Sequence, residues 1–350
     1  MSSLTIANKV PQMSLSVIVP AFDCARYLGL ALPRLLQELS PEDELIVVND
    51  GNSLEVSQLV SEFPVRLVAT ERVRGPAFAR NLGAKTATGS VLVFVDADVL
   101  IAPGALNKIR EELSDLNMGT SAVFGSYDAS PTAENFLSQF RNLFHHFVHQ
   151  NSCEKASTFW SGLGAIRCQA FRQLGGFSTR FQEASIEDIE LGYRLKQRGM
   201  SVKLCKDIQG SHLKHWTLGT LVRTDFFCRA LPWLRLIGER DSVLVNDLNL
   251  TWKDRFCTLF LLIAFFSSFF SLFGLALAFL SAFTVLCFPV LNFFRRERGV
   301  RFAVGSWGML VMHYGICFSA VAYFLVERSL GSRGEEYGKA QAGSINVVSS

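Results

Sequence analysis

Two aspartates, Asp96 and Asp98, stand two residues apart, directly after the uncharged run Val91–Val95. In extended backbone, side chains two residues apart point to the same side, so both carboxylates can face one crevice. Carboxylate oxygens are ligands that suit Mg²⁺ and Mn²⁺. The pair is therefore a candidate divalent-metal site, although an acidic pair can equally close a turn after a buried strand.

Two further aspartates follow apolar runs in the same manner. Asp23 comes after Ser16–Val19, and Asp50 comes after Leu45–Val48. In an open sheet of parallel strands, ligands gather beyond the carboxyl ends of the strands. We therefore expect the three acidic positions to lie along one edge of a sheet.

The elements that must position these side chains alternate along the first half of the chain. Short apolar runs and helical patterns follow one another, which is typical of a parallel sheet covered on both faces. The predicted strands are Ser16–Val19, Leu45–Val48, Val65–Ala69 and Val91–Val95, and the predicted helices are Arg26–Leu39, Leu54–Glu62, Pro76–Ala87 and one after Pro103. Further along, we expect a strand at Ser121–Tyr127, an amphipathic segment at Asn135–His149, a helix at Glu187–Gly199, a strand at Val202–Leu204 and a helix at Leu218–Ala230.

Several short motifs occur in a fixed order. They are Ser16–Pro20 continued by Ala21-Phe22-Asp23, then Val47-Val48-Asn49-Asp50-Gly51, then Arg74-Gly75-Pro76 with Arg80-Asn81-Leu82-Gly83, and then Phe94-Val95-Asp96-Ala97-Asp98. In this order and spacing the sequence resembles the family 2 glycosyltransferases, which have a GT-A fold, a Rossmann-like α/β fold with a mostly parallel sheet. The resemblance extends from Ser16 to Trp233. It implies transfer of a sugar from a nucleotide-diphosphate sugar, a UDP- or GDP-sugar, with a divalent metal, Mn or Mg, as cofactor.

The resemblance also implies a role for individual residues. Asp50 would contact the nucleotide base or ribose, and the Arg74-Gly75 loop with Arg80 would lie along the ribose and diphosphate. The full nucleotide-binding set is Pro20, Ala21, Asp23, Asp50, Arg74, Gly75, Arg80 and Asp96. Many relatives have two aspartates where this chain has Asn49-Asp50, so base recognition is expected to differ in detail.

The implied metal ligands are Asp98, Asp96 and His212. Asp98 would coordinate the metal directly, whereas Asp96 would bind ribose or a metal-bound water. His212 resembles the late histidine that some GT-A enzymes add as a further ligand, and His215 competes with it for that role.

A catalytic base is the next requirement, because an acceptor hydroxyl must lose its proton as it attacks the anomeric carbon. Glu187-Asp188 resembles the Glu-Asp motif of the family, which implies Asp188 as the base and Glu187 as a partner that orients the acceptor. The alternative is that both acids only stabilise the beginning of a helix through its dipole.

Between these sites, the segments around Trp160 and Gly164 resemble those that shape the acceptor pocket. Trp160 can stack on a sugar face, but an aromatic residue beside glycines is as often part of a core. Glycine allows the backbone to approach a sugar closely. His145 and His149 share one helical face and are expected to line the acceptor entrance rather than to bind zinc.

The C-terminal part is strongly apolar. No charged residue occurs from Phe256 to Leu291 or from Phe302 to Val326, and the basic loop Arg295–Arg301 separates the two stretches. An apolar helix needs about 20 residues to cross a bilayer, so the chain is expected to make about three spans, with a hairpin turn near Ser271–Gly274. Because basic loops stay inside, the loop and the catalytic domain are predicted on the cytoplasmic side of a multi-pass inner-membrane protein.

Composition limits the remaining possibilities. The 350 residues can bury a sizeable core, and the net charge of +3 does not suggest a nucleic-acid partner. Met1–Ser14 lacks the features of a secretory signal. The eight scattered cysteines show no zinc-site or disulfide spacing.

The predicted organisation has six parts. They are a disordered N-terminus (1–14), a GT-A domain (15–235), a basic and aromatic juxtamembrane segment (236–255), a two-helix transmembrane hairpin (256–291), a third transmembrane helix (302–326) and a disordered tail (331–350).

The predicted partners are a nucleotide-sugar donor, the bilayer and a membrane lipid or lipid-linked glycan acceptor. Assembly of an extracellular or capsular polysaccharide is the alternative activity, and a non-catalytic sugar-nucleotide-binding protein is an alternative of another class. Arg229 and Trp233 resemble the end of the QxxRW motif of processive members, but the glutamine and the adjacent arginine are absent.

Overall fold

The computed structural model describes residues 13–114, 119–181, 183–239 and 248–345. The chain divides into two compact units, Met1–Trp216 and Thr217–Ser350. Residues 1–12 of the predicted disordered N-terminus (1–14) lie outside the described residues. Residues 240–247 of the predicted juxtamembrane segment (236–255) lie outside them as well.

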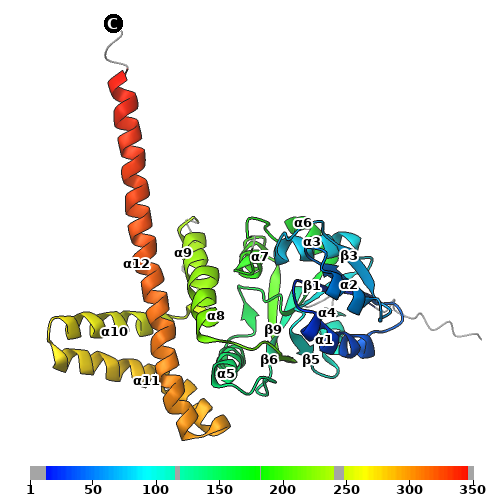
Figure 1. Ribbon diagram of the computed structural model, residues 1–350, viewed down its shortest axis with the longest axis horizontal. Coiled ribbons are helices and arrows are strands. Elements are labelled where there is room, and N and C mark those ends of the chain that lie inside the picture. The colour runs from blue at the N-terminus through cyan, green and yellow to red at the C-terminus, as the bar shows by residue number, and fades with distance from the viewer. Residues whose placement is uncertain (1–12, 115–118, 182, 240–247, 346–350) are drawn as a thin grey trace, which may run out of the picture. The chain divides into compact units, whose positions relative to one another are not determined.

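The first unit is a nine-stranded sheet with helices on both faces (Figure 1). Its strands are β1 Leu15–Ala21, β2 Glu44–Asn49, β3 Arg66–Ala69, β4 Val91–Val95, β5 Val99–Ile101, β6 Thr120–Tyr127, β7 Lys155–Ala156, β8 Leu163–Arg167 and β9 Ser201–His212. Its helices are α1 Ala25–Glu38, α2 Leu54–Val60, α3 Pro76–Thr86, α4 Ala105–Ser114, α5 Phe136–Asn151, α6 Cys168–Leu174 and α7 Glu187–Gln197.

The strand order is β3-β2-β1-β4-β8-β6-β9-β5, and β7 pairs with β9. Strands β1 to β4 are mutually parallel, and β6 is parallel to β9. Strand β8 is antiparallel to both of its neighbours, β4 and β6. The predicted Rossmann-like, mostly parallel GT-A architecture is confirmed, and β1 to β4 agree closely with the predicted strands.

The core explains why these segments form strands. Alternate residues of β1, β2 and β4, such as Val17, Val47 and Val93, are completely or almost completely buried and pack with the apolar faces of α1, α2 and α4. The other residues of the same strands are buried as well, for example Ile18 and Phe94, whose ring lies 5.0 Å from that of Phe177. Strands buried on both faces are read as continuous apolar runs, which is the pattern the sequence shows.

The second unit is helical. It consists of α8 Leu218–Arg223, the π-helix η1 Thr224–Ala230, α9 Leu231–Gly238, the short 3-10 helix η2 Leu248–Leu250, α10 Trp252–Phe269, α11 Phe273–Arg298 and α12 Val300–Ile345. The boundary after Trp216 is earlier than the predicted domain end at 235. The reason is that helices 218–238 pack on α12, for example through the Arg235–Glu327 ion pair.

Two helices, rather than the predicted number of about three, are long and apolar enough to cross a membrane: Phe273–Arg298 and Val300–Leu330. The excluded helix is α10, since Lys253, Asp254 and Arg255 occupy its first turn. A break at residues 270–272 ends α10 within the predicted hairpin turn. Helix α12 continues to Ile345, so the predicted disordered tail (331–350) differs from the structure up to that residue; its alanine, lysine and glutamate residues favour helix.

Candidate active site

The Asp96-Ala97-Asp98 segment connects β4 to β5, and its neighbours come from two other strands. Asp96 N–H donates to the carbonyl of Gly162, just before β8 (3.1 Å), and Val99 of β5 pairs with His212 at the end of β9. This pairing brings the Nε2 atom of His212 to 3.4 Å from Oδ2 of Asp98. The structure thus brings together the predicted ligands Asp98 and His212, whereas His215 is exposed.

Electrostatics favour the ionised form of Asp98. Burial disfavours the charge, but the hydrogen bond with His212 and the charge of that imidazole outweigh burial, and the pKa of Asp98 is lowered. Close by, burial raises the pKa of the Cys24 thiol to about 12, so this cysteine is protonated at neutral pH.

Arg80 lies behind the two aspartates and is 4% exposed. Its Nη2 donates to Asp96 Oδ1 (2.6 Å), and its Nη1 donates to Glu187 Oε1 (2.8 Å). Burial disfavours its charge, but the surrounding carboxylates raise the pKa of Arg80 nevertheless. Arg80 therefore holds the carboxylates of Asp96 and Glu187 together. The sequence predicted instead that Arg80 lies along the ribose and diphosphate. Asp96 differs too, because one of its oxygens is already bound to this guanidinium.

Glu187 is equally committed to the protein. Besides Arg80, it accepts a hydrogen bond from the Ser185 backbone N–H at Oε2 (2.9 Å), and it is 3% exposed. Both carboxylate oxygens thus have a partner in the protein. Because each carboxylate oxygen can accept a second hydrogen bond, the role of Glu187 in orienting the acceptor stays a prediction.

Asp188 has the properties of a base. It lies in the first turn of α7, and its Oδ2 accepts from the Ser161 backbone N–H (3.0 Å) and from the Ser161 hydroxyl (3.2 Å). Burial, followed by the negative charge of Glu187, raises the pKa of Asp188 to about 6. A carboxylate with a pKa near neutrality can accept a proton and still be ionised at pH 7.

Asp50 organises the neighbouring loop instead of facing a free edge. Its carboxylate accepts hydrogen bonds from the backbone N–H groups of Arg74 (2.9 and 3.1 Å) and Gly75 (2.8 Å) and from the Thr70 hydroxyl (2.9 Å). Through these four contacts Asp50 holds the 70–75 loop, and its contact with base or ribose stays a prediction. Asn49, where relatives have aspartate, is buried and bonds to Ser53 through both ends of its amide.

The remaining residues of the predicted nucleotide-binding set lie at the ends of β1 and of the 70–75 loop. Pro20 and Ala21 pair with β2, and Asp23 is exposed with a φ of 46°. Arg74 is exposed, and its guanidinium lies 4.2 Å from the centre of the Phe78 ring. Of this set, Asp23 and Arg74 are exposed, and the side chain of Asp96 is 33% exposed.

The Trp160–Gly164 segment joins the two acidic sites. Trp160 is half-buried, and its ring packs on Tyr127 (4.9 Å between ring centres) and His145 (4.8 Å). A Cβ on Gly164 would lie 2.3 Å from the Trp160 carbonyl oxygen. Glycine is therefore required here by protein packing, which replaces the expected approach to a sugar.

Helix α7 meets the same segment closely. A Cβ on Gly192 would lie 2.4 Å from the Phe159 backbone nitrogen and 2.5 Å from the Thr158 carbonyl carbon. The helix that begins with the Glu187-Asp188 pair thus lies directly against the backbone before β8.

Sequence reasoning missed three residues. Ser161 binds Asp188, Phe177 lies 5.5 Å from the Arg80 guanidinium, and the Tyr127 ring stacks on His212 at 4.5 Å. Ser161 could have been found, because it lies inside a motif that resembles the family. Phe177 lies in a second such motif, Leu174-Gly175-Gly176-Phe177, whereas Tyr127 had no such signal. The rings of His145 and His149 lie 3.9 Å apart beside Trp160.

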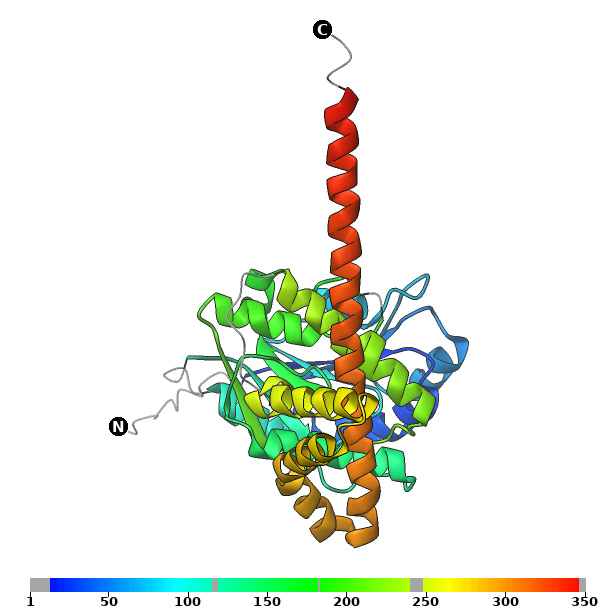
Figure 2. The same ribbon diagram turned by 90° about the vertical axis from the view of Figure 1, so that its left-hand side faces the viewer.

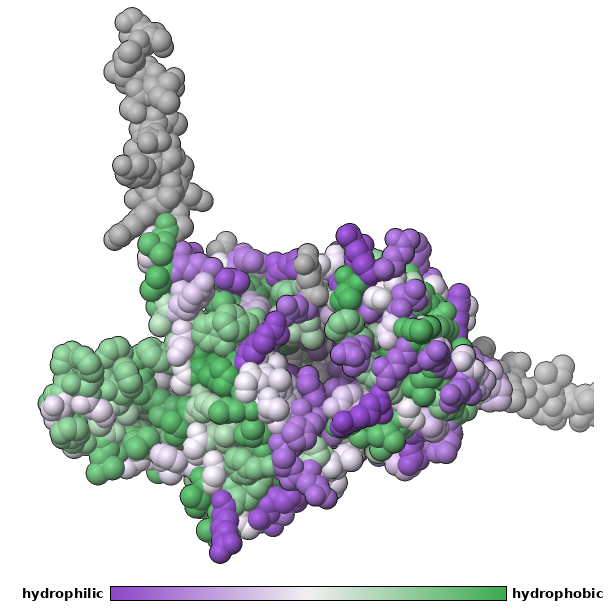
Figure 3. All heavy atoms as spheres, in the orientation of Figure 1, coloured by the Kyte–Doolittle hydropathy of each residue, from purple (hydrophilic) through white to green (hydrophobic). Residues whose placement is uncertain are grey.

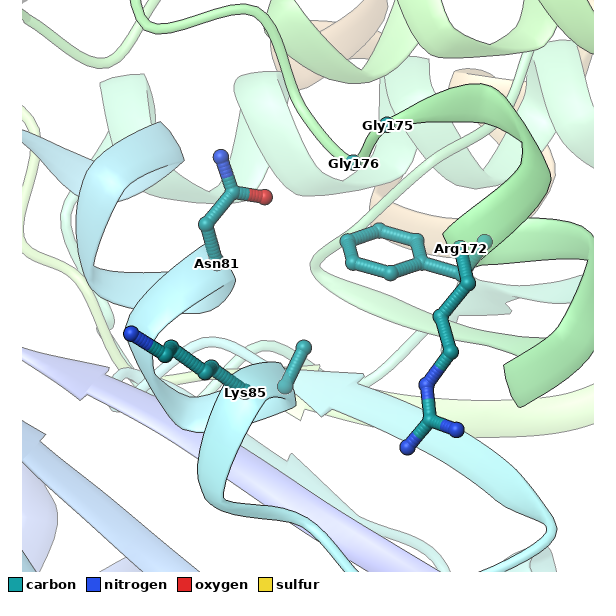
Figure 4. Close-up of a pocket in the computed structure, with 7 residues that line it drawn as sticks. Asn81, Lys85, Arg172, Gly175 and Gly176 are labelled. Atoms are coloured by element: carbon teal, nitrogen blue, oxygen red, sulfur yellow. The ribbon is translucent and has the colours of Figure 1, made fainter.

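A surface pocket of about 350 Å³ lies between α3 and α6 and contains none of the predicted site residues. Its lining consists of Asn81, Ala84, Lys85, Phe171, Arg172, Gly175 and Gly176. The Lys85 and Arg172 side chains extend in different directions (Figure 4). The amide of Asn81 is bonded to the Phe177 backbone (2.8 and 2.9 Å), so this pocket offers no convergent polar groups.

The fold and the carboxylate arrangement together define a glycosyltransferase of the GT-A class. The structure is similar to that of the mannosyltransferase PcManGT from Pyrobaculum calidifontis in complex with GDP-Man and Mn2+, with a TM-score of 0.57, 17% identity and coverage of 90% of this chain and 88% of that one. Residues 16–175 match the model of glycosyl transferase family 2, and residues 141–216 match a model described as the N-terminal domain of galactosyltransferase. Residues 16–175 of this chain are thus similar to a glycosyl transferase family 2 domain.

Curated relatives agree. An uncharacterized glycosyltransferase from Haemophilus influenzae is 27% identical over 186 residues, which cover 52% of this chain and 62% of that protein. The succinoglycan biosynthesis protein ExoO of Rhizobium meliloti is 32% identical over 107 residues, 30% of each chain. The match therefore covers less than two thirds of either relative. The family 2 match and the glycosyltransferase names of the relatives support a transferase over the non-catalytic alternative.

Proposed function

We propose that this enzyme is an inverting glycosyltransferase that moves a sugar from a nucleotide-diphosphate sugar, a UDP- or GDP-sugar, to a membrane lipid or lipid-linked acceptor. The observation that carries the proposal is the position of Asp188. It is joined to Asp96 through Glu187 and Arg80, and its raised pKa suits proton removal from an acceptor hydroxyl. A direct displacement with one base inverts the anomeric centre.

Each protein group has a part in this mechanism. Ser161 holds Oδ2 of Asp188, and the Ile189 backbone N–H donates to Oδ1 (2.8 Å), so the carboxylate is fixed in orientation while its remaining lone pairs can accept a proton. Arg80 and Glu187 fix the base relative to Asp96. Asp23 and Arg74, with accessible side chains at the strand ends, would contact the nucleotide.

Asp98 and His212 would hold the divalent metal, Mn or Mg. A carboxylate and an imidazole suit Mn²⁺, and a cation of this type keeps positions for water and substrate phosphate. Among the described residues, no three His, Cys, Asp or Glu side chains form a metal cluster, which agrees with a site that the donor diphosphate completes. When bound, the cation would neutralise charge on the leaving diphosphate.

Asp188→Asn tests the base. The variant should lose about 10²- to 10⁴-fold in transfer rate, measured as release of nucleoside diphosphate from a panel of UDP- and GDP-sugars. It should still bind the nucleotide by calorimetry. Asp207→Asn, at an exposed position of β9, is the control and should behave like the native enzyme. Full transfer by the Asp188 variant would refute the assignment.

A binding experiment tests the metal pair independently of turnover. Mn²⁺ should strengthen binding of UDP or GDP to the native enzyme, and both Asp98→Asn and His212→Asn should remove this gain. His215→Asn should retain it, because His215 is exposed and remote from the pair. Loss of the gain in the His215 variant alone would reverse the choice between the two histidines.

The second unit would attach the enzyme to the cytoplasmic face of the inner membrane. Its two long apolar helices and the basic loop Arg295–Arg301 support this placement. A growing polysaccharide is the second candidate acceptor, which the similarity to ExoO favours. Labelled product that partitions into an organic phase supports a lipid acceptor, whereas label confined to a water-soluble polymer supports the second candidate.

A further inference from the structure

The second half of α12 is tied to α9 at Glu327. Glu327 accepts two hydrogen bonds from the Arg235 guanidinium, from Nε at 3.1 Å and from Nη2 at 2.6 Å. Between the basic loop before α12 and Glu327, the helix has about 25 uncharged residues, a rise of about 37 Å. Glu327 of α12 must therefore lie on the same side of a membrane as Arg235 of α9.

Other contacts show that α12 runs alongside the helices of residues 218–238. His313 Nδ1 lies 3.1 Å from Oδ2 of Asp225, which is 3% exposed, and the rings of Phe226 and Tyr323 lie 6.1 Å apart. A Cβ on Gly238 would lie 2.9 Å from the Phe324 ring. Figure 1 shows α8 and α9 beside this part of α12.

Helices α8 to α9 have the character of a membrane surface rather than of a span. They follow the catalytic unit directly, and their 21 residues include Arg223, Asp225, Arg229 and Arg235. Charged side chains are rare in membrane-spanning helices, whereas basic helices with exposed apolar residues lie at the interface. Leu218 and Phe227 are 53% and 62% exposed. Glu327 is then held on the catalytic side of the membrane.

The α10–α11 hairpin has a charged base on the same side. Lys253, Asp254 and Arg255 begin α10, and Asp254 accepts a hydrogen bond from Tyr314 of α12 (2.7 Å). The Sγ atoms of Cys257 in α10 and Cys287 in α11 lie 4.0 Å apart. The charged first turn of α10 therefore lies beside the second half of α11. Figure 2 shows the two arms side by side, α10 in yellow.

The first arm of the hairpin, α10, is also too short to cross, whereas α11 alone is long enough. From Phe256 to its end at Phe269, α10 rises about 20 Å, whereas the hydrocarbon core is about 30 Å thick. Exposed apolar side chains gather at its tip, and those of α11 stop at Phe288. The space-filling view shows the apolar surface over α10 and α11 (Figure 3). If α11 crossed completely, the three charges of α10 would lie inside the hydrocarbon core.

We propose that the second unit is a monotopic anchor, which enters the bilayer from the cytoplasmic face and returns to that face. The α10–α11 hairpin dips into the hydrocarbon, and α12 lies along the surface across the base of the hairpin. One face of α12 is covered by protein, since Leu310, Tyr314 and Ala320 are at most 2% exposed. An interfacial helix normally turns a polar face away from the lipid; in α12 the face covered by protein would be the one turned away. The inference rests on the membrane attachment in the proposed function and replaces the three-span path expected from the sequence.

Cysteine labelling in intact cells tests the path. Ser329→Cys marks the end of α12, Ser271→Cys marks the hairpin tip, and Ser61→Cys marks the exposed surface of the catalytic unit. A membrane-impermeant maleimide is applied to intact cells, to inside-out vesicles and to detergent extracts of the full-length variants. The native chain gives the background, and a second membrane protein with an external cysteine proves that the reagent works.

The expected pattern is distinctive. In intact cells, none of the three cysteines is labelled above background. In inside-out vesicles, the cysteines at 329 and 61 react and the one at 271 does not, and in detergent all three react.

Labelling at 329 from outside would show that α12 crosses, and labelling at 271 from outside would show that the hairpin crosses; either result overturns the inference. Recovery of the chain in the soluble fraction would overturn membrane attachment itself, whereas loss of transfer activity would not alter the labelling.

Discussion

The dependence of transfer on pH follows from the environment of Asp188. Burial and the charge of Glu187 raise its pKa to about 6, and only the ionised carboxylate can accept the proton of the acceptor. Activity should therefore be lost as pH falls through 6. The ionised fraction is about nine tenths at pH 7 and about one tenth at pH 5, so kcat/KM should drop about tenfold between them.

Glu187→Gln probes the cause of the shift. Glutamine has the same shape, and its one amide oxygen can still accept from Arg80, although its NH2 group cannot accept from the Ser185 N–H; it removes the negative charge that raises the pKa of Asp188. The acidic limb of the profile should move to lower pH. Glu190→Gln is the control on the same helix, because Glu190 is paired with Arg194 (2.7 Å), and its profile should keep a midpoint near 6.

The assay is release of nucleoside diphosphate at subsaturating donor, measured from pH 4.5 to about 8.5 with enzyme stability checked at each pH. A flat profile down to pH 5 would refute Asp188 as the base. A midpoint that moves upward in the Glu187 variant would refute the electrostatic explanation, because removal of a neighbouring negative charge can only favour ionisation of Asp188.

Two further changes test the packing of the site. Arg80→Met should lower the free energy of unfolding by about 3–5 kcal/mol, because it leaves the two carboxylates without their buried counter-charge; urea unfolding measures it, with exposed Arg74→Met as the control. Equal stability of the two variants would contradict the bridging role. Gly164→Ala should cost about 1–3 kcal/mol through overpacking, whereas Gly219→Ala, which meets no atom within 4 Å, should be neutral or slightly stabilising. An unchanged midpoint of unfolding in the Gly164 variant would contradict this account.

The sequence predicted the strands of the parallel half well because they are buried on both faces. Strand β4 was predicted with its observed bounds, Val91–Val95, and its residues are all completely buried. Strand β9 was predicted only at Val202–Leu204 but extends from Ser201 to His212, because its alternate residues are polar. The sequence did not predict strand β8. Its Gly164 is required by packing against Phe159 and Trp160, and glycine gives no strand signal.

The candidate site, like the sheet, was predicted from the sequence only in part. The resemblance predicted the acidic positions as a group, and the structure brings Asp98 to His212 and places Asp188 at the start of a helix. It could not show which side chains bind to one another. Arg80 and Glu187 are 107 residues apart in sequence, and their contact depends on how α3 and α7 pack. Local patterns do not contain that information.

The close contact between α7 and the backbone at Thr158 and Phe159 has a consequence for enzyme engineering. Because not even a methyl group fits at Gly192, the helix cannot slide to present its base to a differently shaped acceptor. Exposed positions that can be varied without moving the helix lie in the segment that precedes it, residues 178–181 and 183–185, for example Thr179 and Ala184. A library confined to that segment would vary the acceptor while the proton-accepting group stays where it is.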